Sequence, residues 1–382
     1  MLKELGMIHT GSTPKTNDDS LFGGDIPFVT PSDLDSVSPI QNTPRTLTEA
    51  GVKTADLLPA ESVLVCCIGS LGKIGFAGRP VVTNQQINAV VFNPAKVHAR
   101  FGFYACRMLK PQLELMAPAT TVPIVNKSRF SELRIPVPPL EAQRRIAAIL
   151  DQAETLRTQR RQALAHLDTL TQSLFLDMFG DPVVNPKGLP TRELQEVVKP
   201  GAIVTYGIVQ AGDEFPGGVP YIRTGDLVNG SIRLSELRHT DPELAAKFSR
   251  SRVETNEIVM SIRATVGTTA LVPAELDGAN LTQGTARIAP GEDMHFYYLL
   301  YFLRSDSTQH WIDRQVKGAT FREITLGRLR ELPVLVPPLS LQQTFATRIQ
   351  AIEALKATHR TALAQLDALF ASLQQRAFAG EL

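Results

Sequence analysis

The sequence predicts a mixed α/β protein in which two related globular halves are each followed by a long helix. Three observations carry this prediction: an internal repeat at an offset close to 199 residues, short apolar runs between turn residues, and two heptad-patterned segments. The 382 residues are enough for two or three domains, each with its own core. We therefore expect two α/β domains separated by two long helices that pack as an antiparallel coiled coil, with a pseudo-twofold internal repeat.

The internal repeat is clearest toward the end of each copy. Residues 121–143 (TVPIVNKSRFSELRIPVPPLEAQ) match residues 320–342 (TFREITLGRLRELPVLVPPLSLQ) without a gap. Upstream, DIPFVTPSDL at 25–34 matches GVPYIRTGDL at 218–227, and SVLVCCIGSLG at 62–72 matches EIVMSIRATVG at 257–267. A period near 200 residues is far too long for a solenoid, so it indicates a duplicated domain.

The two globular halves share a pattern of short apolar runs bounded by Gly, Pro, Asn and Asp. Runs such as SVLVCCIG, NAVVFNP, EIVMSIR and TARIAPG are typical of short strands joined by turns. Helices are expected between them, near 100–116 and 294–314. The predicted boundaries are 1–136 for the first globular domain, 137–181 for a central helical region, 182–335 for the second globular domain, and 336–382 for a C-terminal helical region.

Long helices are predicted at 141–179 and 340–378, each directly after a Pro-Pro pair. Apolar residues recur there at alternating spacings of three and four for about four heptads, which favours a coiled coil over a surface helix. Gly180 and Gly380 are the expected helix ends. The predicted seam consists of Ile146, Ile149, Leu156, Leu167, Leu170 and Leu174 in the first helix, and Ile352, Leu355, Leu366, Leu369 and Leu373 in the second.

The two helices can satisfy each other by packing antiparallel, which would put the globular halves at opposite ends of a rod. A helix of roughly 39 residues is about 58 Å long at 1.5 Å per residue. In the alternative arrangement each helix packs only on its own domain. The length of the heptad pattern favours the first arrangement.

Composition limits the classes of function. The formal net charge is +1, so any nucleic-acid site must be a local patch and not a field of the whole molecule. The three cysteines, Cys66, Cys67 and Cys106, do not form a disulfide framework. The first 15 residues contain no apolar signal core, and no run of about 18 apolar residues could span a membrane. A cytoplasmic protein is expected.

A search for catalytic motifs finds little. The seven histidines are scattered, and no Cys/His group has zinc-ligand spacing, so no metal site is expected. No Lys follows Asp or Glu by two positions, as in many nucleases, and no Asn/Asp-Pro-Pro-aromatic motif of amino-group methylation occurs. The GSLGK stretch at 69–73 lacks the full phosphate-loop spacing. We therefore expect no catalytic residues and a chain that recognises its target without reacting with it.

Several short motifs occur in order along the chain. They are GSTPK (11–15), the turn with Pro31, Asp33 and Leu34 and its partner RTGDL (223–227), NQQ (84–86), IRATVG (262–267), both VPPLxxQ helix starts, and AFAGEL (377–382). Each motif is weak alone, but together they resemble one family over the whole chain, the specificity subunits of type I restriction-modification enzymes.

The resemblance implies a DNA-recognition subunit without an active site of its own. Each globular half would read one half of a bipartite, asymmetric site on double-stranded DNA. The helices would set the spacer and dock methyltransferase subunits, two of them expected, and restriction subunits would join the full complex. The resemblance places S-adenosylmethionine and ATP on those partner subunits, with no cofactor on this chain. The alternatives are a specificity module of another phage-defence or DNA-modification assembly, and a self-contained enzyme.

Comparing the two halves selects candidate DNA contacts. Positions that keep their residue type in both halves are expected to be framework. Asp33 with Asp226 and Thr121 with Thr320 are examples. Loop positions that change chemistry are candidates for different readings, because Arg to guanine is the commonest specific contact. The alternative for each is a solvated charge or a salt bridge. The candidates are Lys15, Lys73, Arg79 and Lys127 in the first half and Arg223, Arg263, Lys317 and Arg322 in the second.

Overall fold

The computed structural model describes residues 1–117, 122–318 and 322–381, so Thr121 and Thr320 lie outside the described residues. The chain divides into two compact units. Unit 1 comprises Met1–Gln162 and Arg360–Leu382, and unit 2 comprises Ala163–His359. The unit boundaries fall inside the two long helices, so each unit contains one globular half and a segment of both helices. The predicted domain boundaries at 136, 181 and 335 separate the globular halves from the helices. The division into units does not do this, so those boundaries stay a prediction.

Unit 1 is built on a four-stranded antiparallel sheet in the order β1-β7-β4-β5. A second sheet, β3-β2-β6, combines an antiparallel and a parallel pair. Two runs predicted as strands, SVLVCCIG and NAVVFNP, are confirmed as β4 and β7. The strands are β1 Gly6–Thr10, β2 Phe22–Val29, β3 Thr46–Leu47, β4 Val63–Cys66, β5 Ile74–Phe76, β6 Val82–Thr83 and β7 Ile87–Phe92.

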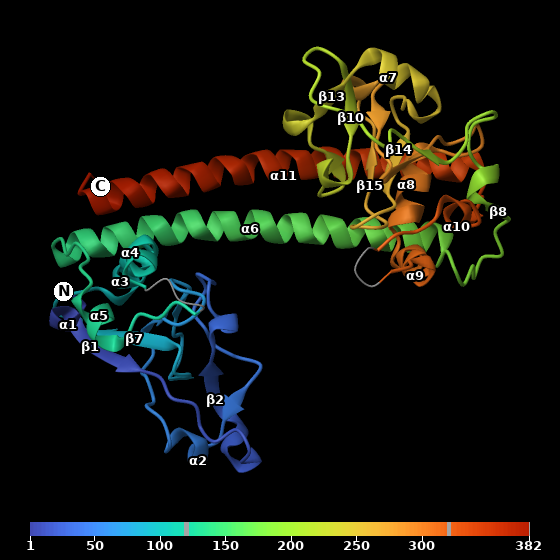
Figure 1. Ribbon diagram of the computed structural model, residues 1–382. Coiled ribbons are helices and arrows are strands. Elements are labelled where there is room, and N and C mark those ends of the chain that lie inside the picture. The colour runs from blue at the N-terminus through green and yellow to red at the C-terminus, as the bar shows by residue number, and fades with distance from the viewer. Residues whose placement is uncertain (118–121, 319–321, 382) are drawn as a thin grey trace. The chain divides into compact units, whose positions relative to one another are not determined.

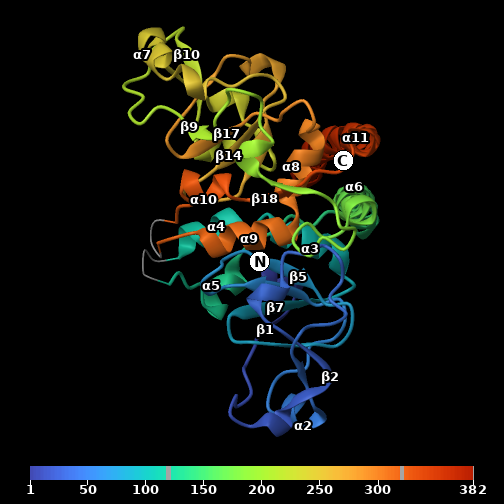
Figure 2. The same cartoon turned by 90° about the vertical axis from the view of Figure 1, so that its right-hand side faces the viewer.

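The helices of unit 1 lie mainly on one side of the larger sheet. Figure 2 shows β1, β5 and β7 together near α3, with β2 and α2 at the remote end of the unit. Phe101, Phe103 and Tyr104 of α3 are fully buried in the core with Val63 and Phe130, which explains why an apolar helix covers this face. The helices are α1 Leu2–Leu5, α2 Glu49–Val52, α3 Ala99–Arg107, α4 Lys110–Met116 and α5 Lys127–Glu132.

Unit 2 repeats this plan, with a four-stranded sheet β15-β14-β17-β9 and a three-stranded sheet β13-β10-β16. The predicted strands EIVMSIR and TARIAPG are confirmed as β14 and β17. The strands are β8 Thr191–Glu193, β9 Thr205–Tyr206, β10 Val219–Ile222, β11 Leu227–Val228, β12 Ser231–Ile232, β13 Arg238–Thr240, β14 Ile258–Ser261, β15 Thr269–Leu271, β16 Asn280–Leu281, β17 Thr285–Ile288 and β18 Pro333–Leu335. The short helices are α7 Pro242–Lys247, α8 Phe296–Arg304, α9 Asp306–Gln315 and α10 Leu326–Arg330.

The structural repeat follows the sequence repeat element by element. β4, β5 and β7 of unit 1 correspond to β14, β15 and β17 of unit 2, and both sets pair antiparallel in the same order. The parallel pair β2–β6 has its counterpart in β10–β16. Helices α3 and α4 correspond to α8 and α9, as predicted near 100–116 and 294–314. The mixed α/β class and the internal duplication are therefore confirmed.

Two long helices continue through both units: α6 spans Leu140–Phe179 and α11 spans Leu339–Ala379. Their observed bounds lie within one residue of the predicted ones. Both end at a glycine with left-handed backbone geometry, Gly180 at φ +79° and Gly380 at φ +82°. The Lys187 ammonium donates to the carbonyl of Met178 at 3.0 Å, which places a positive charge at the negative end of α6.

Within each unit the segments of α6 and α11 pack antiparallel. In unit 2 the Phe179 and Phe345 rings lie 5.3 Å apart, and Lys356 pairs with Asp168 at 2.8 Å farther along. Moving back along α6 thus means moving forward along α11 (Figure 1). In unit 1 Arg157 pairs with Asp367 at 2.6 Å. The sequence repeat relates Arg157 to Lys356 and Asp168 to Asp367, so the duplication produces the same ion pair in both units.

The predicted seam needs correction at alternate positions. Ile146 is buried, and Leu167, Leu174, Ile352, Leu366 and Leu373 are half-buried, as is Ile149. Four predicted seam leucines instead face solvent, with exposed fractions of 43–51%: Leu156, Leu170, Leu355 and Leu369.

The less exposed stripe of each helix contains the residue that follows each of these leucines. Those residues are Arg157, Thr171, Lys356 and Phe370. The correct spacing is again three and four, but with the four-residue step first. The error arose because Arg157 and Lys356 are polar, and their charges are satisfied by acidic partners across the helix pair. Apolar pattern alone therefore selected the neighbouring leucines.

Within the part of the chain that the structure describes, no helix combines the length and the apolar character needed to cross a bilayer. The same described residues contain no group of three or more His, Cys, Asp or Glu side chains that could hold a metal ion.

Candidate functional site

The glutamine of the first VPPLxxQ motif joins the globular half of unit 1 to the start of α6. Gln143 is completely buried. Its side-chain oxygen accepts from the His98 amide at 2.8 Å, and its nitrogen donates to the carbonyls of Lys96 at 3.0 Å and Pro138 at 2.7 Å. His98 is the N-cap residue of α3, so one side chain connects the beginnings of two helices.

Unit 2 contains the same joint. Gln342 is also completely buried, accepts from the His295 amide at 2.8 Å, and donates to the carbonyls of Asp293 at 3.0 Å and Pro337 at 2.8 Å. The two motifs therefore set the direction in which each long helix leaves its own globular half. Neither glutamine was predicted as a functional residue, although its recurrence in both motifs was a signal.

The matched turns after β2 and β10 are each held by an aspartate. Asp33 accepts from the Thr30 amide at 2.8 Å, and Asp226 accepts from the Arg223 amide at 2.8 Å. In unit 2 the Arg223 guanidinium also binds Asp226, with Nη2 at 2.7 Å from Oδ1. This hydrogen bond raises the pKa of Arg223. Part of the guanidinium of this predicted DNA contact is thus occupied by a neighbouring carboxylate.

Three of the predicted basic residues of unit 2 gather around one segment. Arg263 pairs with Glu323 through both a backbone bridge and an ion pair at 3.0 Å. Lys317 forms a backbone bridge with Glu323 as well, and its side chain is exposed. Arg322 pairs with Asp313 at 2.8 Å. Arg223 lies in a different turn and is not part of this group.

The matching bridge in unit 1 has different chemistry. Ile68 pairs with Ile124 where unit 2 has Arg263 with Glu323. Ile124 is 46% exposed and its counterpart Glu323 is 42% exposed, so this position is open to solvent in both units. The backbone is therefore shared while an apolar pair replaces a charged pair, which is the kind of change expected of loops that read different sequences.

The predicted basic residues of unit 1 are more dispersed. Lys15 is exposed in the loop after β1, and Lys127 is exposed in the first turn of α5. Arg79 pairs with Asp25. Lys73 lines a cavity, where its ammonium lies 3.6 Å from Asp35. Whether any of these eight side chains contacts DNA stays a prediction.

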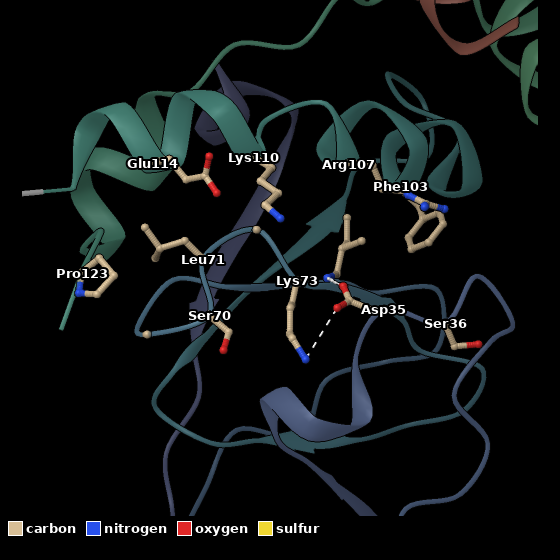
Figure 3. Close-up of a pocket in the computed structure, with 13 residues that line it drawn as sticks. Asp35, Ser36, Ser70, Leu71, Lys73, Phe103, Arg107, Lys110, Glu114 and Pro123 are labelled. Atoms are coloured by element: carbon tan, nitrogen blue, oxygen red, sulfur yellow. Dashed lines mark hydrogen bonds and ion pairs between the residues drawn. The ribbon is translucent and has the colours of Figure 1, made fainter. Parts of the chain in front are cut away.

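A cavity with a volume of about 620 Å³ opens in the described part of unit 1 (Figure 3). It lies between the loop Gly69–Lys73, the end of α3 and the start of α4. Three cationic side chains line it, Lys73, Arg107 and Lys110, together with the carboxylates of Asp35 and Glu114. Arg107, Lys110 and the carboxylates were missed from the sequence because the loop and the helices are far apart in the chain.

Comparison with known proteins decides what these paired units are. The family model described as the type I restriction modification DNA specificity domain matches residues 1–166 and 186–368. The chain belongs to this family. Its two matched regions correspond to the two repeats, so the specificity-subunit function predicted from the sequence is confirmed and the two regions fit two recognition domains for DNA sequence.

Related specificity subunits align over most of this chain. The type I restriction enzyme EcoBI specificity subunit of Escherichia coli is 23% identical over 352 residues, which cover 84% of this chain and 74% of that protein. The MjaIX specificity subunit of Methanocaldococcus jannaschii is 24% identical over 387 residues, covering 92% of this chain and 85% of that protein.

Two solved structures share the fold. The S subunit of the type I restriction-modification system from M. genitalium covers 99% of this chain and 94% of its own, with a TM-score of 0.61 and 15% identity. A chain from a structure on complex assembly and conformational transition of the type I R-M system covers 100% of this chain and 97% of its own, with a TM-score of 0.57 and 20% identity.

Proposed function

We propose that this specificity subunit is a non-catalytic DNA reader within a multisubunit methyltransferase and restriction enzyme. Each globular half would read one half of a bipartite, asymmetric site. The observation that supports this most directly is the duplicated framework with changed loop chemistry, Ile68 with Ile124 in unit 1 and Arg263 with Glu323 in unit 2. Shared framework residues position the loops, and differing side chains specify different bases.

The two long helices would dock the methyltransferase subunits. The four exposed leucines are the candidate contact points, because they occupy repeat-related positions on the surfaces of both helices. Unit 1 carries Leu156 and Leu369, and unit 2 carries their repeat-related counterparts Leu355 and Leu170, all 43–51% exposed. Two equivalent surfaces fit two methyltransferase subunits, with restriction subunits joining the full complex.

S-adenosylmethionine and ATP would bind to those partner subunits and not to this chain. The partners would also supply much of the attraction to DNA, because this chain has a net charge of only +1. A cytoplasmic location stays a prediction of the sequence.

The test is methyl transfer to DNA from S-adenosylmethionine, with this chain alone and with a methyltransferase subunit added. We expect transfer only in the mixture. Transfer by the purified chain alone would contradict the proposal that it is non-catalytic. If the methyltransferase subunit methylated the same DNA equally well without this chain, that result would contradict the chain's role in recognition.

A further inference from the structure

The cavity of unit 1 has an excess of positive charge that its own carboxylates do not satisfy. Lys73 is 38% exposed and lies 3.6 Å from Asp35, which is a loose ion pair. Within the described part of the chain, the Lys110 ammonium has no hydrogen-bond or ion-pair partner, and Figure 3 shows it pointing from α4 toward the loop that carries Leu71. A solvent-exposed cation beside a cavity is available to an incoming anion.

Arg107 adds a cation that is costly to bury. Its Nη1 atom is buried and has no hydrogen-bond partner among the described residues. Its guanidinium lies 5.9 Å from the Phe103 ring and 5.8 Å from the Phe370 ring. Burial lowers the pKa of Arg107, the direction expected when a charge lacks compensation. Arg107 also lines the cavity, so the charge of an anion held there would offset part of this cost without a contact to the buried Nη1 atom.

At the equivalent position of unit 2, the arginine has hydrogen-bond partners. Arg304, at the end of α8 as Arg107 is at the end of α3, donates to the carbonyl oxygens of Gly230 at 2.8 Å and Thr269 at 2.9 Å. Gln309 replaces Lys110 and donates to the carbonyl of Gly267 at 3.1 Å.

The loop glycines confirm that Lys110 and Gln309 are equivalent. A Cβ atom at Gly72 would lie 2.6 Å from Lys110, and one at Gly267 would lie 2.3 Å from Gln309. Both glycines have positive φ, +76° and +92°. The backbone is therefore conserved between the repeats, while Lys73 and Lys110 of unit 1 are replaced by the neutral Thr268 and Gln309 of unit 2.

We propose that the cavity of unit 1, with Lys73, Lys110 and Arg107, binds one phosphodiester group of the DNA backbone, and that the equivalent place in unit 2 does not. This inference rests on the DNA recognition proposed above and adds an asymmetry to it. The cavity borders Gly69 and Pro123, which flank the Ile68–Ile124 pair in the chain. A phosphate held there would position the unit 1 loops against the bases, as phosphate contacts do in DNA readers. With about 620 Å³, the cavity also has room for the sugar beside the phosphate.

The test is the salt dependence of DNA binding by the full chain assembled with its methyltransferase partner. The variants Lys110→Gln and Lys73→Thr, alone and together, give unit 1 the residues that unit 2 tolerates at the same positions. The slope of log affinity against log salt is negative. We expect it to become less steep by about 0.9 in the double variant, which corresponds to the loss of one phosphate contact. The base preference of the remaining binding should not change.

Three controls keep the outcome interpretable. Lys53→Gln removes an exposed charge of unit 1 outside the cavity and should leave the slope at the wild-type value. Lys110→Arg keeps the charge and should keep the slope even if Lys110→Gln perturbs the fold. Inorganic phosphate should weaken DNA binding by the wild type more than by the double variant at equal ionic strength.

The results that overturn the inference are distinct from those that overturn the proposed function. If the double variant kept an unchanged slope and sequence-specific binding, the phosphate site would be refuted while the proposed recognition function would stand. Binding of inorganic phosphate without any change in the DNA slope would mean that the cavity holds a small anion and not the DNA backbone. Loss of all sequence preference in the wild-type assembly would contradict the recognition function itself.

Discussion

At the residue scale, the two buried glutamines explain why the VPPLxxQ motif occurs twice. The prolines start each helix, but Gln143 and Gln342 each connect it to the globular half through two hydrogen bonds and make a third to a proline carbonyl of the motif. Both glutamine side chains are completely buried, so their polar atoms depend on these bonds. The motif is therefore a joint between two parts of a unit as well as a helix start.

Replacing Gln143 with Leu should destabilise unit 1 by about 1–3 kcal/mol, because the His98 amide and two carbonyls lose their partner. Urea unfolding of the full chain measures the change. Gln159→Leu, at an exposed position of the same helix, is the matched control and should be close to neutral. Equal stability of the two variants would refute the role of Gln143 as a joint.

His295 makes a second residue-scale prediction, which concerns pH. Its Nδ1 accepts from the Tyr297 amide at 3.2 Å, which requires a neutral ring, and burial lowers its pKa from 6.5. The unfolded chain therefore takes up the proton more readily than the folded one, so this stability is complete above about pH 6.5 and is lost as the pH falls below it.

The variant His295→Asn keeps a cap acceptor without a titrating group and should flatten this part of the pH dependence of the melting temperature. The control is His98→Asn, because the equivalent histidine of unit 1 makes no side-chain cap hydrogen bond. A pH profile that is the same for wild type and His295→Asn would contradict the assignment.

At the element scale, the sequence predicted where the long helices begin and end, but not which of their residues lie in the seam. Proline, glycine and apolar spacing act locally, so α6 and α11 were placed within one residue. Which side of a helix is buried depends on the residues opposite it. Arg157 and Lys356 are charged, so they fit in the seam only because Asp367 and Asp168 pair with them there. The cavity was missed for the same reason, because its cations converge only in the folded unit.

The corrected seam predicts that Lys356 tolerates its repeat counterpart but not truncation. Lys356→Arg reproduces the residue at 157 and should be nearly neutral, whereas Lys356→Ala should cost about 1–3 kcal/mol by removing a charged hydrogen-bonded group that is 5% exposed. Thermal unfolding compares the two variants. An equal loss in both would mean that packing, and not the ion pair with Asp168, determines stability there.

The exposed leucines predict a change in partner number. Leu156→Glu with Leu369→Glu should remove one of two methyltransferase subunits, because two negative charges on the helix surface of unit 1 oppose docking there. Native mass spectrometry counts the subunits. The control Gln159→Glu adds a charge at another exposed position of α6. Two bound subunits in the double variant would place docking elsewhere.

At the scale of the whole molecule, we propose that the paired helices set the spacer of the DNA site. Inserting seven residues after Arg160 and seven after His359 adds one heptad to both helices. The added length is about 10 Å, or roughly 3 base pairs of duplex. We expect the variant to methylate sites with the same two recognition elements but a longer gap. An unchanged gap would disprove the ruler role of the helices.

The central claim is that one chain carries two independent readers of DNA sequence. The most direct test is a map of the sites methylated by the wild-type chain assembled with its methyltransferase partner. The duplicated units predict two short, different recognition elements separated by a fixed stretch of unspecified sequence. A single uninterrupted motif, or methylation without any sequence preference, would contradict it.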